Sequence, residues 1–417
     1  MNILSLSSVF PNPAELGLGL FVHARLNEIS RIANVKVIVP IAALDYSNPK
    51  GRLYRPRTGP WVRSDGRMEV FHPRWVFPPG GTPANVLCLF LRLYPLVRRL
   101  HRRFAFDLID AHFGYPEGVV AALLAWAFRV PFVITLRGSE LMFASYRARR
   151  LAMQWAFGRA GKIICVSEEL RQFAIREGAP PDKVVTISNG VDNALFFPRD
   201  RAVVRSKHGI PADRKVILSA GEMIEAKGHQ HVAGALRDMV AEGVDAQLLI
   251  VGSSARGGPR YEGALRRLVK NLDVGDRIRF IGWADRQGLA ELLSAADVFC
   301  LASYTEGWPN VVHEALACGT PVVATRVGAI PEMIPSADYG LVTPVKDQAA
   351  LLIALRSALR TEWDRDQIAR WGGARTWNQV ANEALAVFRS IVHRDATSSE
   401  REKVSIPAGG RQNHVRN

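Results

Sequence analysis

The sequence contains few cysteines. Its 417 residues include four thiols, and no two of them form a C-x-x-C pair. This spacing argues against a disulfide framework and against a structural zinc site, because both need clustered cysteines. Cys165 and Cys300 lie inside apolar runs, which is typical of reduced core residues, so we expect a cytoplasmic protein.

Unbroken apolar runs long enough to span a membrane are also lacking. The nearest candidate, 118–136, is interrupted by Arg129 and Pro131, and its pattern favours a helix followed by a buried strand over a membrane span. The first residues carry no positive charge ahead of their short apolar run. They therefore predict a first strand rather than a signal peptide.

Negative charge is under-represented. The chain has 54 Lys and Arg against 39 Asp and Glu, which gives a net charge of +15. This excess favours an anionic partner, such as a phosphorylated substrate, an anionic membrane surface or nucleic acid. With 48% apolar residues the composition is nevertheless that of a folded protein, which excludes disorder over most of the length.

Two common signatures of ligand chemistry are missing. The only D-x-D tripeptide, 364–366, falls in a helical segment, so no divalent metal site is expected. Gly17 and Gly19 do not complete G-x-G-x-x-G, because the third position is Val22. A dinucleotide cofactor is therefore not predicted, although these glycines let the backbone approach a ligand closely.

Short runs rich in Val and Ile alternate with helical segments in both halves of the chain. Runs that are apolar on both faces and separated by helices indicate parallel sheets in α/β layers. We expect strands at 2–6, 35–39, 108–111, 132–136, 163–166 and 184–187, and again at 216–220, 247–251, 277–281, 298–302 and 322–325.

The pattern restarts near residue 215, which predicts two doubly wound, Rossmann-like domains facing each other across a cleft. An N-terminal domain at 1–195 is followed by a charged, Pro-containing linker at 196–214 that is expected to bury little. After the C-terminal domain at 215–364 we expect terminal helices at 365–393, able to cross back to the first domain, and a disordered tail at 394–417.

The densest motif is S-Y-T-E-G-W-P-N-V-V-H-E at 303–314. It follows an expected strand, and Pro309 suits the first position of a helix that ends at Gly319. Glu306 then lies before the helix and Glu314 on it, beside a helix N-terminus that suits a phosphate. The carboxylates suit sugar hydroxyls better than the phosphate. The alternative is a surface loop with a capped amphipathic helix.

Further candidates stand at other strand ends. Lys227, with Gly228 at a helix start, can place an ammonium over a diphosphate, or it is a solvated lysine in an ordinary turn. His112 closes a strand and is expected to point into the cleft, where it can hydrogen-bond a hydroxyl or carry a proton. The alternative is a capping or core histidine. Arg137 and Asn189 close two further strands.

Two stretches of the N-terminal half, 92–104 and 147–157, mix arginines with apolar residues. An amphipathic basic face of this kind can lie on anionic lipid, and the alternative is a solvated helix face. The sequence is therefore compatible with a cytoplasmic protein held peripherally at the inner face of the membrane.

The order of these motifs resembles that of the retaining glycosyltransferases of family 4, which have the GT-B fold. The resemblance runs from Asn2 to about Val387, and its most specific element is the E-x7-E motif of Glu306 and Glu314. It is also carried by the Gly17/Gly19 loop and by the segments D-L-I-D-A-H, R-G-S-E, S-N-G-V-D and E-A-K-G-H.

The resemblance implies a nucleotide-sugar donor, such as a UDP- or GDP-sugar, in the C-terminal domain, with the N-terminal domain on the acceptor side. Glu314 would hold the ribose hydroxyls, Glu306 would face the donor sugar and Lys227 would neutralise the diphosphate. His112 would lie near the transferred sugar. The donor would also meet Gly17 and Gly19 from the first domain and the backbone around Gly307, Trp308, Pro309, Asn310 and Val311.

One position departs from the family pattern. Glu222 stands in A-G-E-M where the family often has an arginine. Arg137 or Arg256 can supply the missing positive charge, or Lys227 holds the diphosphate alone.

The predicted function is retaining, metal-independent transfer of a sugar to a glycan or lipid-linked acceptor in surface polysaccharide or glycoconjugate synthesis. No cofactor and no nucleic-acid partner are expected. Two alternatives stay open. A GT-B-like sugar-nucleotide epimerase would alter the donor sugar without forming a glycosidic bond, and a non-catalytic binder would hold polyanions or lipid surfaces in a salt-dependent manner.

Overall fold

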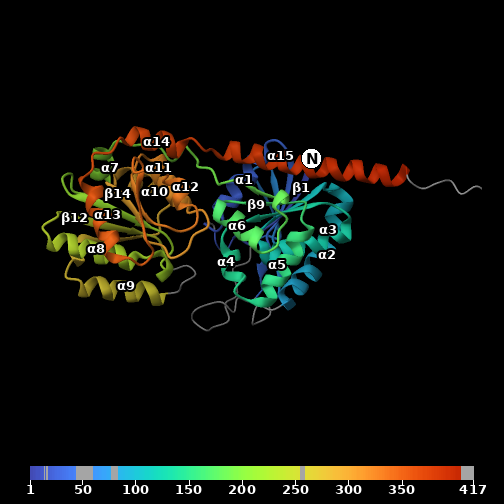
Figure 1. Cartoon of the computed structure of the whole chain (residues 1–417), viewed down its shortest axis with the longest axis horizontal. Coiled ribbons are helices and arrows are strands. Elements are labelled where there is room, and N and C mark those ends of the chain that lie inside the picture. The colour runs from blue at the N-terminus through green and yellow to red at the C-terminus, as the bar shows by residue number, and fades with distance from the viewer. Residues whose placement is uncertain (14, 16, 44–59, 77–82, 254–258, 405–417) are drawn as a thin grey trace, which may run out of the picture.

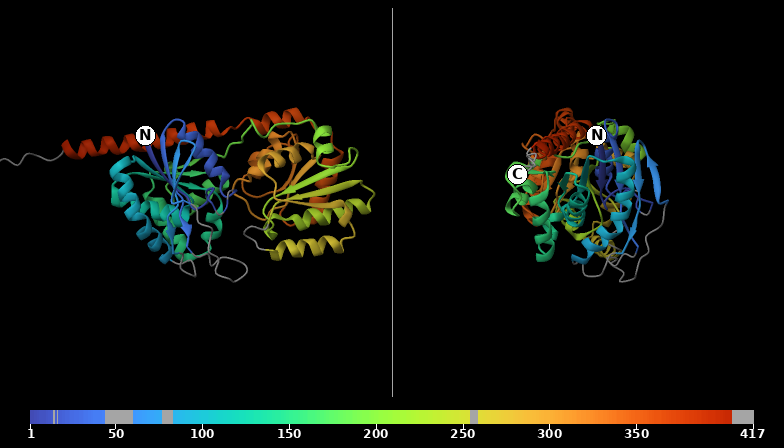
Figure 2. Two further views of the ribbon diagram at one scale, coloured as in Figure 1. Left: turned by 180° about the vertical axis from the view of Figure 1, so that it is seen from behind. Right: turned by 90° about the vertical axis from the view of Figure 1, so that its right-hand side faces the viewer.

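The computed structural model describes residues 1–13, 15, 17–43, 60–76, 83–253 and 259–404. These residues form two α/β units placed along the long axis of the molecule, and a long helix runs from the second unit back along the first (Figures 1 and 2). This is the two-domain arrangement that the restart of the strand pattern predicts.

The first unit is built on an eight-stranded sheet with the order β10-β9-β8-β7-β1-β2-β5-β4, parallel except for β4 against β5. Its strands are β1 (Asn2–Leu6), β2 (Asn34–Ile38), β4 (Val62–Asp65), β5 (Met68–Phe71), β7 (Leu108–His112), β8 (Phe132–Leu136), β9 (Lys162–Cys165) and β10 (Val184–Thr186). The short strands β3 (Ile41–Ala42) and β6 (Arg74–Trp75) pair separately. Its helices are α1 (Leu20–Ser30), α2 (Pro83–Phe104), η1 (Gly114–Gly118), α3 (Val119–Phe128), α4 (Ser139–Phe143), α5 (Arg147–Arg159), α6 (Glu168–Arg176) and η2 (Pro181–Lys183).

The second unit has a six-stranded, fully parallel sheet with the order β13-β12-β11-β14-β15-β16. Its strands are β11 (Lys215–Ala220), β12 (Ala246–Val251), β13 (Ile278–Gly282), β14 (Val298–Leu301), β15 (Val322–Thr325) and β16 (Gly340–Thr343). Its helices are η3 (Glu225–Lys227), α8 (His229–Ala241), α9 (Pro259–Asn271), η4 (Gly275–Arg277), α10 (Arg286–Ala295), α11 (Asn310–Ala317), α12 (Ile330–Met333), α13 (Gln348–Arg360) and α14 (Arg365–Gly373).

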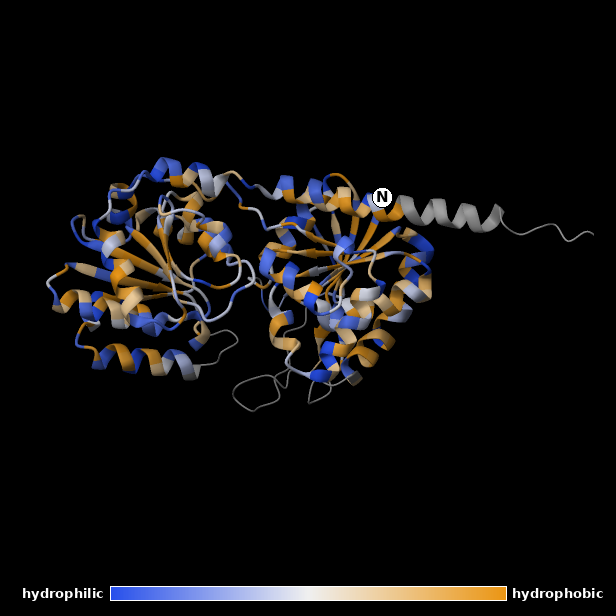
Figure 3. Cartoon of the chain, viewed as in Figure 1, coloured by the Kyte–Doolittle hydropathy of each residue, from blue (hydrophilic) through white to orange (hydrophobic). Residues whose placement is uncertain are grey.

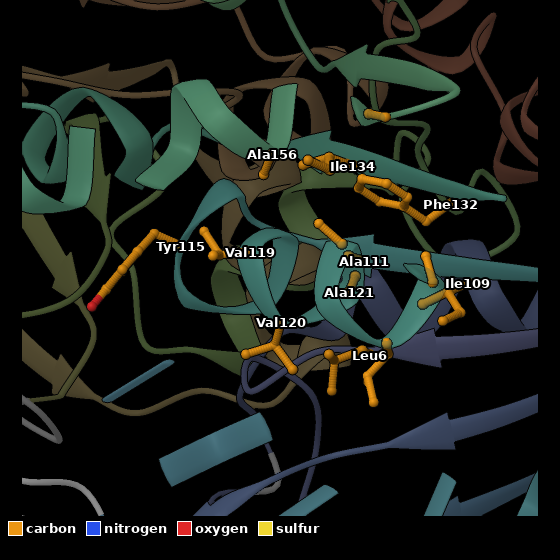
Figure 4. Packing of buried hydrophobic residues seen from close by; sticks show 14 of the residues in the cluster. Leu6, Ile109, Ala111, Tyr115, Val119, Val120, Ala121, Phe132, Ile134 and Ala156 are labelled. Carbon is orange, nitrogen blue, oxygen red and sulfur yellow. The ribbon is translucent and has the colours of Figure 1, made fainter. Parts of the chain in front are cut away.

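The central strands are buried on both faces and largely apolar, because helices cover both faces of each sheet. All residues of β7 and β8 are buried. On one face of the first sheet, Ile134 packs in one cluster with Val120 of α3 and Ala156 of α5 (Figure 4). This two-sided burial is why these strands lack the alternation of polar and apolar residues seen in half-exposed sheets. The nearly apolar stretch at 118–136 forms α3 and β8, and no helix in the described ranges is long and apolar enough to cross a membrane.

The carboxyl ends of the strands of both sheets meet at the boundary between the units. A Cβ atom added to Gly138, after β8, would lie 2.9 Å from the Cα of Gly307, after β14. Asn189, after β10, donates a hydrogen bond of 3.0 Å from Nδ2 to Oδ1 of Asn310 at the start of α11. The loops at the strand ends therefore line the boundary, which is where open α/β sheets bind their ligands.

Residues 196–214 are not the weakly buried linker that their composition predicts. They contain α7 (Arg201–Lys207), and Val204 and Ile210 are buried in one apolar cluster with residues of β11. A charged residue of this segment also forms an ion pair within the protein, since Arg205 lies 2.7 Å from Asp297. The prediction failed because the charges were taken as solvated, whereas the partner of Arg205 lies 92 residues away along the chain.

The tail predicted at 394–417 also differs in part. The last helix, α15 (Trp377–Val404), continues through 394–404, and residues 405–417 lie outside the described ranges. The helix returns to the first unit, where Phe388 is buried in one cluster with Val22 of α1. The prediction ended the helix at 393 because the apolar periodicity stops there, whereas the helix itself continues to Val404.

Candidate functional site

The E-x7-E segment joins β14 to α11 at the boundary between the units. Glu306 lies in the connecting loop, and Glu314 lies on the helix. Pro309 is the residue before the first helical turn rather than part of it, with an extended backbone (φ −73°, ψ 93°), so α11 starts at Asn310. The first turn of the helix carries backbone N–H groups without intrahelical partners, which suits an anion.

Lys227 and Glu306 contact each other across two loops of the second unit. Nζ of Lys227 lies 2.6 Å from Oε1 of Glu306, and the same oxygen accepts a hydrogen bond of 2.7 Å from the hydroxyl of Ser303. The approach is close because Gly228, with φ +71°, packs its backbone on Ala302. An added Cβ there would lie 2.0 Å from the carbonyl oxygen of Ala302. The structure therefore brings together two of the residues predicted for the donor site.

Glu314 lies deeper at the same edge of the sheet. Its side chain is partly buried, and this burial raises the pKa of Glu314 to about 7. Arg286 opposes the rise and Asp192 adds to it. Within the described residues the carboxyl group makes no hydrogen bond, so both oxygens can accept bonds from a ligand.

Trp308 and Val311 pack the loop and α11 in place. Trp308 contacts apolar clusters of both units, and its ring meets that of His313 edge-on at a centroid distance of 5.8 Å. Val311 packs on the cluster of the second unit. Trp308 therefore holds the loop that carries Glu306 against the first unit, and Val311 holds the start of α11 on the second.

The first unit contributes a buried row of charged and polar groups. Asp110 of β7 forms two contacts with the guanidinium of Arg25, at 2.9 and 2.8 Å. Burial alone would raise the pKa of Asp110, but the charge of Arg25 beside it holds the pKa well below the ordinary value. The carboxylate is therefore ionised and fixed at the end of the row.

His112 was predicted to point into the cleft, and the structure instead buries it completely in this row. Its Nε2 lies 3.1 Å from Asp110, and its Nδ1 is 3.0 Å from Nη2 of Arg137. Burial lowers the pKa of His112 to about 3, so the ring is neutral. This is the core position that the sequence left open as an alternative, because β7 is covered on both faces. A role toward the transferred sugar stays a prediction.

Arg137 closes β8 at the boundary between the units. It is 8% exposed, and burial lowers its pKa well below the ordinary value. Its carbonyl oxygen would lie 2.0 Å from a Cβ atom added to Gly307, so only glycine fits at position 307. The backbone of Arg137 thus lies directly against the loop of the E-x7-E motif, and its assignment to the donor site stays a prediction.

The two glycines near the N-terminus differ in their surroundings. Gly19 has φ +66°, and an added Cβ would lie 2.2 Å from the carbonyl oxygen of Val9, so this glycine is needed by the fold. Gly17 is exposed, and no protein atom lies within 4 Å of an added Cβ. At Gly19 the protein itself excludes a side chain. At Gly17 it does not, so there a bound ligand is what could require the absence of a side chain.

Glu222 stands where the family often has an arginine, and which residue supplies that positive charge stays a prediction. Glu222 lies two residues after the end of β11 and is partly buried, and Arg256 lies outside the described residues. The described part of the chain contains no cluster of His, Cys, Asp or Glu able to hold a metal ion, and metal independence also stays a prediction.

Sequence reasoning missed several residues that shape this site. Ser303 bonds Glu306, and Asp110 and Arg25 anchor the buried row. Asn189 was placed at a strand end, but its link to α11 was not foreseen. The one available signal was Asp110, since a carboxylate inside an otherwise apolar strand needs a buried partner. Nothing in the sequence identifies that partner, because Arg25 lies on a separate helix.

Two family models match the chain. Residues 43–195 match "Glycosyltransferase Family 4", and residues 200–373 match "Glycosyl transferases group 1". Together they span both units and include the E-x7-E segment in the second match.

Curated relatives match at moderate identity. N-acetyl-alpha-D-glucosaminyl L-malate synthase of Bacillus anthracis is 32% identical over 59% of this chain, and the match spans 65% of that enzyme. D-inositol 3-phosphate glycosyltransferase of Saccharomonospora viridis is 30% identical over 68% of this chain and 72% of its own length. The putative teichuronic acid biosynthesis glycosyltransferase TuaC of Bacillus subtilis is 26% identical over 88% of this chain and 90% of its own length.

Solved structures share the architecture. Anabaena HepE in complex with UDP has a TM-score of 0.72 and 20% identity, covering 94% of this chain and 100% of that one. At this identity the likeness establishes the two-domain fold of the chain.

Proposed function

The chain belongs to the group 1 glycosyltransferases of family 4, and we propose that it transfers a sugar with retention from a nucleoside diphosphate sugar, without a metal. The proposed acceptor is a glycan or lipid-linked saccharide of surface polysaccharide or glycoconjugate synthesis. The observation that carries the proposal is the contact of Lys227 with Glu306 beside the start of α11. An anion, a sugar and a helix N-terminus can meet at that point.

In the proposed reaction the diphosphate lies at the first turn of α11. Lys227 turns from Glu306 to the diphosphate and stabilises the negative charge that grows as the sugar departs. Stabilisation of this kind is the main source of rate enhancement in many enzymes. Glu306 then accepts hydrogen bonds from the sugar, and Glu314 accepts them from the ribose. The departing phosphate takes the proton of the acceptor hydroxyl, so the new bond forms on the face that the phosphate leaves.

We favour a UDP-sugar as the donor and keep a GDP-sugar as the alternative. The solved complex of HepE with UDP supports this choice. The testing experiment is a thermal-shift screen of UDP, GDP and their sugars against the purified chain, since a ligand that binds only the native state raises the melting temperature. The absence of a shift with every nucleotide would refute the proposed donor site.

The reaction type needs a separate measurement. NMR of the product formed from an α-linked donor sugar should show a new glycosidic bond with the α configuration. An inverted bond would refute retention, and an altered sugar nucleotide without a glycosidic bond would support an epimerase instead. Activity in excess EDTA tests the proposed metal independence.

We also propose that α2 and α5 rest on an anionic membrane surface. On α2 the exposed residues Leu87 (55%), Leu91 (60%) and Tyr94 are spaced for one helix face, which then continues into Arg98 and Arg102. Figure 3 shows apolar and charged residues interleaved on the lower helices of the first unit, where α2 and α5 lie. Within the described residues neither arginine has an ion-pair or hydrogen-bond partner.

Large apolar side chains beside these arginines suit lipid better than nucleic acid, which offers such leucines little to contact. Flotation with phosphatidylglycerol vesicles tests this part. The variant Leu87→Ser/Leu91→Ser should float far less than the wild type, whereas Ile353→Ser, an exposed residue of α13, should float normally. Equal flotation of all three proteins would refute the surface without touching the proposed transfer reaction.

A further inference from the structure

A continuous row of side chains runs from the core of the first unit to the donor-side helix α11 of the second. It starts at Asp110 and continues through His112 to Arg137. Nη1 of Arg137 then donates to Oδ1 of Asn189 at 3.1 Å, and Nδ2 of Asn189 donates to Oδ1 of Asn310 at 3.0 Å. Each member except Asn310 is less than 9% exposed.

The direction of every bond in this row follows from Arg137. Its guanidinium only donates, so Nδ1 of His112 accepts and the neutral ring carries its proton on Nε2, which lies 3.1 Å from Asp110 but makes no hydrogen bond to the described residues. Arg137 can only donate, which fixes the amide of Asn189 with its oxygen toward Arg137. The NH₂ group of Asn189 must then face Asn310. The orientation of Asn189 is therefore set by the buried guanidinium of Arg137, which follows a different strand.

The loop of Asn189 also lies where the chain crosses between the units. The backbone N–H of Val191 donates to the carbonyl of Arg375 at 2.8 Å, and a Cβ atom added to Gly190 would lie 2.6 Å from the backbone of Thr376. Asn189 therefore contacts the acceptor-side core, the start of α11 and the neighbourhood of the returning segment. Asn189 is therefore buried within the boundary between the units.

We propose that Asn189 is a positioning residue for the donor, acting through Asn310 to orient the first turn of α11. This rests on the proposed binding of a diphosphate at that turn. The bond ties the N–H groups of α11 to the position of Arg137, so the phosphate meets both at a fixed separation. Without the bond, α11 can turn away from the first unit, and the nucleotide loses affinity.

The test measures UDP affinity by calorimetry in Asn189→Leu, which has a similar shape but no hydrogen-bonding group. We expect the Kd for UDP to rise about 3- to 10-fold, the size of one net hydrogen bond. Asn189→Asp keeps an acceptor for Arg137, and the amide of Asn310 can turn to donate to it, so this variant should stay close to the wild type. Asn193→Leu is the matched control, because this exposed residue of the same loop makes one long side-chain bond to the described residues, to Gly373 at 3.5 Å.

A double-mutant cycle separates positioning from a general loss of structure. Asn310→Leu removes the same bond from the more exposed side, so it remains informative if Asn189→Leu fails to fold. The double variant should bind UDP no more weakly than either single variant, because both lose one shared interaction. Additive losses, unchanged affinity in Asn189→Leu, or an equal loss in Asn189→Asp would overturn the proposal. A wild type that binds no nucleotide would instead refute the donor site itself.

Discussion

Replacing Lys227 with alanine is expected to lower turnover by about 10²–10³-fold, the effect of removing one donor from a site of developing negative charge. The structure indicates that the fold will survive. The side chain of Lys227 is 25% exposed, and it pairs with Glu306 at 2.6 Å. Surface pairs contribute about 0–1 kcal/mol to stability, and because Glu306 is only 9% exposed we expect the upper end of this range, a change of about 2–4 °C in melting temperature.

The loss of turnover has two physical sources. The leaving diphosphate loses a cation, and the carboxylate of Glu306, which is only 9% exposed and is then held by Ser303 alone, faces the phosphate without neutralisation. Both effects grow with the negative charge on the departing group, so they act mainly on the transition state. We therefore expect kcat to fall more than the donor KM rises.

The assay follows product formation at saturating donor, using the sugar nucleotide that gives the largest thermal shift in the wild type. Lys215→Ala is the matched control, since this exposed lysine lies at the opposite end of β11. A folded Lys227→Ala variant with turnover within about threefold of the wild type would refute the assignment of Lys227 to the diphosphate.

Three further results are expected. Gly17→Ala should keep the wild-type melting temperature, because no protein atom lies within 4 Å of the added Cβ, and should weaken donor binding in calorimetry; unchanged affinity would remove Gly17 from the site. Glu314→Ala should weaken nucleotide binding with the fold intact, and the ribose role fails if calorimetry finds the same affinity. Burial lowers the pKa of His112 from 6.5 to about 3, so the stability it contributes above pH 6.5 is lost as the pH falls toward 3. Melting curves of His112→Asn should therefore decline less steeply over that range, and a decline parallel to the wild type would contradict this.

Much of the fold could be predicted because its signals are local. Every strand expected from a short apolar run is present, within one or two residues, since strands covered by helices on both faces must be apolar throughout. Strands β4, β5 and β16 were missed because they lie toward the sheet edges or carry polar residues. The placement of Lys227 beside Glu306 was also foreseeable, because parallel strands bring their carboxyl ends to one edge.

The sequence by itself determined the strands, the restart of the pattern and the motif that faces the boundary, because each depends on residues close together in the chain. Only the tertiary structure decided what the buried polar groups do. His112 fits a core residue and a ligand contact equally well until β8 is seen beside β7, where Arg137 occupies its free nitrogen. The side-chain partners of Asn189 in this row, Arg137 and Asn310, lie on other segments of the chain. The bond to Asn310 forms because the two sheets meet end to end. Such pairings depend on the order of strands and on the packing of two units, which no local pattern encodes.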